Sequence, residues 1–141
     1  RAINTELGDF ADKYSDRVLL ASSLGQSRYL GLLKLVDVVV GNSSSGVIEA
    51  PAVGVPSVNI GDRQKGRLRA ASVVDCENTS LDITEAIHKC MSKVFRKQAF
   101  LCGNPYGEPG KISKEIKEIL KGADLDRILV KHFFDLVEDK E

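Results

Sequence analysis

Apolar residues along this chain follow two different spacings. Short runs with no polar interruption are typical of strands that are buried on both faces. Stripes in which apolar residues recur every three or four positions are typical of helices. The predicted strands are residues 18–22, 37–41, 55–60 and 72–76. The predicted helices are residues 3–14, 26–36, 47–51, 79–100 and 112–122.

The alternation of these strands and helices predicts an α/β fold. Strands that are apolar on both faces form parallel sheets with helices on either side, so we expect a Rossmann-like three-layer domain over residues 1–122. A further helical stripe begins at Leu125 and predicts a C-terminal helical tail within residues 123–141. Because the first helix has no strand before it, we expect the sequence to be an excised part of a longer protein.

Composition narrows the class of partner. The chain has 141 residues, of which 43% are hydrophobic, and this is enough for one packed core. Twenty Lys and Arg balance twenty Asp and Glu, so neither nucleic acid nor an anionic membrane is an expected partner. No apolar run approaches the roughly 18 residues that span a bilayer, and the N-terminal residues do not resemble a signal peptide.

The cysteines and histidines follow no catalytic or metal-binding pattern. Cys76, Cys90 and Cys102 are odd in number and lack CxxC spacing, which argues against a disulfide framework or a zinc site and favours a reducing cytoplasm. We expect them to pack as small apolar residues. His88 and His132 have no accompanying Ser/His/Asp or HExxH pattern, so structural or surface roles are expected. No metal or cofactor is predicted.

The densest chemical signal is the run Val40-Gly-Asn-Ser-Ser-Ser-Gly-Val-Ile-Glu-Ala-Pro51, where a predicted strand turns through small residues into a helix. Open parallel sheets bind ligands at such turns, and the amides of a helix N-terminus can hold a diphosphate. Ser43 and Ser44 add hydroxyl donors without bulk. Glu49, one turn along the helix, could accept both hydroxyls of a ribose. The alternative is an ordinary N-cap turn followed by a solvated glutamate.

A second cluster, Gly61-Asp-Arg-Gln-Lys-Gly-Arg67, follows the next predicted strand and therefore lies at the same edge of the sheet. It carries three cations within five positions. As an isolated run it could be a solvated loop. Beside a phosphate-binding turn, Arg63 or Arg67 could instead offer bidentate hydrogen bonds to phosphate oxygens.

Together these runs resemble a known family. The residues that carry the resemblance are Gly41–Pro51, Gly54-Val-Pro56, Asn59–Arg67, Ser72–Cys76, Ser23-Leu-Gly-Gln-Ser-Arg-Tyr-Leu30 and Asn104-Pro-Tyr-Gly107. They are similar to hydrolysing UDP-N-acetylglucosamine 2-epimerases of sialic acid biosynthesis, over roughly residues 2–122. Non-hydrolysing relatives carry a TDSGG-like run at the first cluster, so the hydrolysing branch is favoured.

The resemblance implies a role for each matched residue. Ser43 and Ser44 would bind the UDP phosphates, Glu49 the ribose hydroxyls, and Arg63 would lie against the nucleotide, while the backbone at Leu24 would meet the uracil. The family has a two-domain GT-B architecture, of which this chain corresponds to the C-terminal half. The N-terminal half is then an expected partner that supplies the catalytic acids and bases, so no catalytic residue is predicted here.

Several alternatives stay open on sequence alone. The same turn is compatible with the nucleotide domain of a GT-B glycosyltransferase, or with a non-catalytic nucleotide-binding module. The UDP-amino sugar could be UDP-N-acetylglucosamine or UDP-diacetylbacillosamine, and a homo-oligomer is an open question. Turn chemistry favours a role for Tyr106 in orienting the helix that follows it, rather than in contacting ligand.

Overall fold

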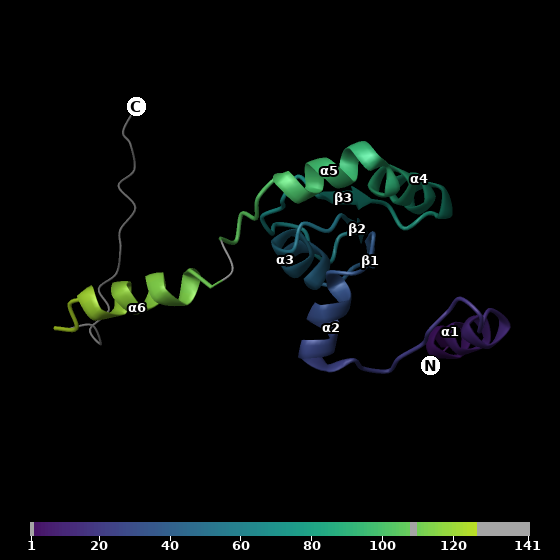
Figure 1. Ribbon diagram of the computed structural model, residues 1–141, viewed down its shortest axis with the longest axis horizontal. Helices are drawn as coiled ribbons and strands as arrows, with labels where there is room; N and C mark the ends of the chain where they lie inside the picture. Colours follow the sequence, from purple (N-terminus) through teal and green to yellow (C-terminus); the bar gives the residue numbers. More distant parts are fainter. Residues whose placement is uncertain (1, 108–109, 127–141) are drawn as a thin grey trace, which may run out of the picture. The chain divides into compact units, whose positions relative to one another are not determined.

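The computed structural model describes residues 2–107 and 110–126 of the 141 (Figure 1). The helices are α1 (Ala2–Lys13), α2 (Gly25–Leu33), α3 (Ser45–Ala52), α4 (Ser80–Met91), α5 (Lys93–Leu101) and α6 (Ile112–Gly122). The strands are β1 (Val39–Gly41), β2 (Ser57–Ile60) and β3 (Val73–Cys76). Contacts divide the chain into two units, Arg1–Tyr106 and Gly107–Glu141, and the sheet lies in the first.

The three strands form one parallel sheet in the order β1-β2-β3. Val40 pairs with Val58, and Val58 pairs in turn with Val74, so β2 is the central strand. Parallel neighbours require a crossover, and α3 supplies it between β1 and β2. The crossover from β2 to β3, residues 61–72, contains neither helix nor strand. Because all strands run the same way, their carboxyl ends meet at one edge.

Helices cover both faces of this sheet. Ser57 donates a short hydrogen bond from its hydroxyl to the Gly46 carbonyl of α3, whereas the next residue, Val58, packs against Ala86 and Cys90 of α4. Successive residues of a strand point to opposite faces, so α3 and α4 lie on opposite sides of β2, as Figure 1 also shows. The predicted three-layer α/β fold with a parallel sheet is therefore confirmed.

The core is small and tightly packed around the central strand. Val58 is 1% exposed, and on the other face Val47 of α3 is fully buried. The turn from α3 into β2 depends on Gly54, whose φ is 73°. A Cβ atom there would lie 2.9 Å from the ring of Phe100, so only glycine suits both the backbone conformation and the space.

One predicted strand, residues 18–22, is wrong. These residues follow α1 as irregular chain, and Leu19 is 89% exposed. An apolar run becomes a strand only when a neighbouring strand takes up its hydrogen bonds, and within the described residues β1 pairs with β2 alone. The apolar run at residues 18–22 predicted a strand, but the sequence pattern does not reveal whether a neighbouring strand is there to pair with it.

The single helix predicted over residues 79–100 is also wrong, because it is interrupted at Ser92. That residue is extended, with φ −65° and ψ 140°, and it is the C-cap of α4 and the N-cap of α5. Its hydroxyl donates to the Lys89 carbonyl at 2.9 Å and accepts from the Phe95 amide at 3.3 Å. Serine is a favoured N-cap, and this signal outweighed the continuous apolar stripe.

The remaining elements match their predicted ranges to within a few residues. The helix predicted at 112–122 is confirmed as α6. The tail predicted from Leu125 lies almost wholly outside the described residues. The predicted end of the Rossmann-like domain at residue 122 stays a prediction. The division of the chain by contacts falls earlier, after Tyr106.

Candidate functional site

The turn from β1 into α3 presents unused hydrogen-bond donors. Within the described part of the chain, the backbone amides of Ser43 and Ser44 have no hydrogen-bond acceptor. Ser44 is the N-cap of α3, yet its side chain makes no capping bond. The Ser43 hydroxyl accepts only a long bond of 3.4 Å from the Ser45 amide. Free N–H and O–H groups at the positive end of a helix are the donors that an anion needs.

Glu49 lies one helical turn beyond these donors, on α3. Its side chain is half-buried, and its Oε2 atom is shielded from solvent without a hydrogen-bond partner in the described residues. A buried carboxylate oxygen that lacks a donor destabilises the protein by about 1–3 kcal/mol or more. A hydroxyl group from a bound ligand would remove this cost. The structure therefore places Glu49 on the short helix α3, which begins directly after the Ser43–Ser44 turn.

Arg63 reaches the same turn from the loop after β2. Its Nη1 atom lies 3.5 Å from Asn42 Oδ1, and its side chain is otherwise exposed. The neighbouring Gln64 donates from Nε2 to the Asn42 carbonyl at 2.8 Å. The loop 61–69 thus lies directly against the residue that precedes Ser43. The structure places the guanidinium beside the unused donors, where two sources of positive potential add.

Leu24, predicted to meet a base through its backbone, is the N-cap of α2 and is half-buried. It lines a hollow of about 470 Å³ together with Ala21, Ser23, Gly25, Gln26 and Tyr29. Tyr29 also makes a short hydrogen bond through its hydroxyl to the Ser45 hydroxyl, at the first residue of α3. The hollow beside Leu24 is therefore connected through Tyr29 to the donor-rich turn.

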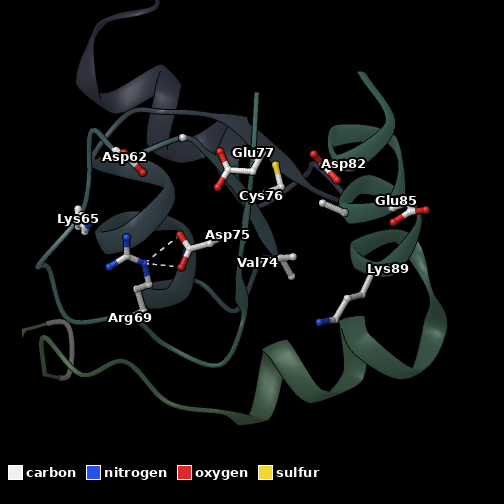
Figure 2. A pocket seen from close by; sticks show the side chains of 12 residues that line it. Asp62, Lys65, Arg69, Val74, Asp75, Cys76, Glu77, Asp82, Glu85 and Lys89 are labelled. Atoms are coloured by element: carbon white, nitrogen blue, oxygen red, sulfur yellow. Dashed lines mark hydrogen bonds and ion pairs between the residues drawn. The ribbon is translucent and has the colours of Figure 1, made fainter. Parts of the chain in front are cut away.

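A larger hollow of about 550 Å³ lies one strand further along the same edge, between the ends of β2 and β3 and helix α4 (Figure 2). Its charged lining residues are Asp62, Lys65, Arg69, Asp75, Glu77, Asp82, Glu85 and Lys89. Acids outnumber bases there, which disfavours a diphosphate. The unused donors lie instead at the β1–α3 turn, outside this larger hollow.

The cysteine thiols are not activated. Burial, with the nearby carboxylates of Asp82, Asp75 and Glu77, raises the pKa of the Cys76 thiol. Burial raises the pKa of Cys90 to about 11, so both thiols are protonated at neutral pH. All three cysteines are free.

His88 is exposed on α4, and His132 lies outside the described residues.

Two further side chains near the turn were not predicted as site residues. Tyr29 and Gln64 lie within the runs that resemble the family, but neither the resemblance nor the hydrophobic pattern predicts a role for either side chain. Tyr106 is expected from its turn chemistry to orient the helix that follows it; in the structure its hydroxyl donates to the Leu68 carbonyl at 3.0 Å. The preceding Asn104 donates to the Ile48 carbonyl of α3 at 3.3 Å. Asn104 and Tyr106 thus brace α3 and the loop after β2.

A parallel α/β domain with unused donors where a strand turns into a helix belongs to the class of open-sheet domains that bind ligands at the carboxyl ends of their strands. Comparison with known proteins is more specific. The family described as UDP-N-acetylglucosamine 2-epimerase matches residues 2–121, and the chain belongs to this family.

Individual relatives agree with the family. The chain is 42% identical over 134 residues to the GDP/UDP-N,N'-diacetylbacillosamine 2-epimerase (hydrolyzing) of Campylobacter jejuni. This alignment covers 95% of the chain and 34% of the relative. The chain is 35% identical over 132 residues to the polysialic acid biosynthesis protein P7 of Escherichia coli, covering 92% and 32%. The chain thus spans about a third of the length of these relatives. None of the helices in its described part is long and apolar enough to cross a membrane.

Proposed function

We propose that this chain is the UDP-binding half of a hydrolysing UDP-N-acetylglucosamine 2-epimerase, which converts UDP-N-acetylglucosamine and water to N-acetylmannosamine and UDP. One observation carries the proposal. Glu49 is half-buried, and within the described residues one of its oxygens has no partner and lies one helical turn from unused amide and hydroxyl donors. That spacing fits a ribose followed by a diphosphate, with Arg63 beside the phosphates.

In this proposal the chain acts on the leaving group. Cleavage of the bond between the sugar C1 and the diphosphate oxygen leaves negative charge on UDP. The amides of Ser43 and Ser44 and the guanidinium of Arg63 stabilise that charge and so lower the barrier. Removal of the C2 proton and addition of water require acids and bases, and we assign these to the N-terminal half of the full-length protein.

A second amino sugar is favoured by one specific observation. The C. jejuni relative, which is 42% identical, bears a name for a 2-epimerase of diacetylbacillosamine nucleotides. The nucleotide contacts proposed here serve UDP-diacetylbacillosamine equally well, because they involve only the UDP part.

The proposal also includes a cytoplasmic location, supported by three cysteines that all remain unpaired.

Product analysis of the full-length protein tests the proposed reaction. We expect release of free N-acetylmannosamine and UDP from UDP-N-acetylglucosamine without an acceptor, or of the corresponding sugar from UDP-diacetylbacillosamine. This chain by itself should bind UDP but release no sugar. Turnover that depends strictly on an added acceptor would show a glycosyltransferase and contradict the proposal.

A further inference from the structure

The loop that brings Arg63 to the turn contains no helix or strand of its own. It spans residues 61–69 and leaves the sheet at the end of β2. A loop of this kind keeps a single conformation only where side chains from rigid elements are bonded to it. Tyr106 holds the loop at the Leu68 carbonyl. Gln64 and Arg69, within the loop, join it to the β1–α3 turn and to β3.

Gln64 joins the loop to the phosphate-binding turn. Its side chain is only 4% exposed, and Nε2 donates to the Asn42 carbonyl at 2.8 Å. Asn42 directly precedes the two serines with unused amides. The orientation of those amides therefore depends on where Gln64 holds the peptide group of Asn42.

Arg69 in turn holds the backbone of Gln64. Its Nη2 atom donates to the Gln64 carbonyl at 3.0 Å, and Nη1 donates to the Arg67 carbonyl at 2.8 Å. Its Nε atom pairs with the carboxylate of Asp75 at 2.8 Å. Figure 2 shows the guanidinium facing Asp75, with both carboxylate oxygens joined to it by dashed lines. The planar guanidinium thus bonds in three directions, which a lysine ammonium cannot reproduce with the same geometry.

Asp75 is itself fixed by the sheet. It belongs to β3, in register with Asn59 of the central strand. Asn59 is 2% exposed, and its Nδ2 atom donates to Asp75 Oδ1 at 2.7 Å. A continuous series of hydrogen bonds therefore runs from the sheet through Asp75, Arg69 and Gln64 to the turn.

We propose that Arg69 is a positioning residue for the phosphate-binding turn, which it holds through Gln64 without touching the nucleotide. This inference rests on the proposed function, because its consequence is measured as UDP affinity. An ordinary surface ion pair contributes little to folding stability and nothing to binding at a distant site. Arg69 differs because two of its three bonds go to backbone carbonyls of the loop that carries Arg63.

The experiment compares Arg69→Met with a matched control, Arg96→Met. Arg96 forms an ion pair with Asp37 just before β1, so its loss removes an Arg–Asp pair at the opposite edge of the sheet. We expect Arg69→Met to raise the Kd for UDP about tenfold and to speed amide exchange at residues 42–46. The control should change neither. Arg69→Lys, which keeps the charge but not the three-way geometry, should weaken UDP binding like Arg69→Met.

A double-substitution cycle distinguishes positioning from general destabilisation. Because Arg69 acts on the turn through Gln64, Arg69→Met should weaken UDP binding less in a Gln64→Met background than in the unaltered chain. Fully additive effects, or unchanged affinity and exchange in Arg69→Met, would overturn the inference. If the unaltered chain bound no UDP, the proposed function would fail, and amide exchange at residues 42–46 would still decide whether Arg69 holds the turn.

Discussion

Glu49 is the residue on which the chemistry of the site depends most. A glutamate at this position in a short helix is usually solvated, but here one carboxylate oxygen is shielded and has no donor in the described residues. Such an oxygen destabilises the unliganded protein and gives a ligand hydroxyl an interaction that water does not already provide. We interpret it as the acceptor for a ribose, next to the unused donors of Ser43 and Ser44.

This interpretation predicts a selective effect of Glu49→Gln. The amide keeps the size of the side chain but loses its charge and one acceptor oxygen, so the Kd for UDP should rise by about tenfold or more. The ratio between the affinities for UDP and 2'-deoxy-UDP should shrink at the same time, as measured by calorimetry. Glu85→Gln on α4 is the control and should leave both affinities unchanged. Equal UDP affinity in Glu49→Gln and the unaltered chain would contradict the ribose assignment.

At the scale of elements, the sequence predicted best what is encoded locally. The β1–α3 turn was predicted because small residues between an apolar run and a helical stripe have few other structures available. Residues 18–22 were mispredicted because a strand needs a partner that no local pattern reveals. Arg69 was missed because it bonds to backbone carbonyls and to a residue on another strand, and such contacts leave no motif in the sequence.

The break between α4 and α5 gives a prediction about stability. Ser92 caps α5 by accepting the Phe95 amide, so Ser92→Ala should lower the free energy of unfolding by about 1 kcal/mol. Urea unfolding followed by circular dichroism measures this change. Ser22→Ala, in irregular chain, serves as the control. An unchanged or higher stability of Ser92→Ala would indicate that the two helices can run on as one.

At the scale of the whole molecule, we propose that the chain contributes nucleotide binding, and its described residues include no identified acid–base pair. It spans about a third of its relatives, and we assign proton transfer to the remaining length. The described part holds no group of three or more His, Cys, Asp and Glu side chains able to bind a metal ion. Because the chain has no net charge, the proposed recognition of a diphosphate depends on local groups such as Arg63, whose guanidinium lies 3.5 Å from Asn42 Oδ1.

The stability of the molecule should depend on pH through Cys90. Its folded-state pKa of about 11 lies above the ordinary value of 9.0, so the folded protein holds this proton more tightly than the unfolded chain. The resulting stabilisation is fully present below pH 9 and is lost as pH rises from 9 to 11. Cys90→Ala should therefore show a smaller fall in unfolding free energy across this window. Parallel pH profiles for the two proteins would contradict the assignment.

The claim that a diphosphate binds where β1 turns into α3 is tested most directly by NMR titration of this chain with UDP. We predict that the largest amide shifts fall on Ser43 and Ser44, with further shifts at Glu49 and Arg63 and little change at Glu77 or Glu85. Shifts confined to the hollow between β2, β3 and α4, with Ser43 and Ser44 unaffected, would contradict the account.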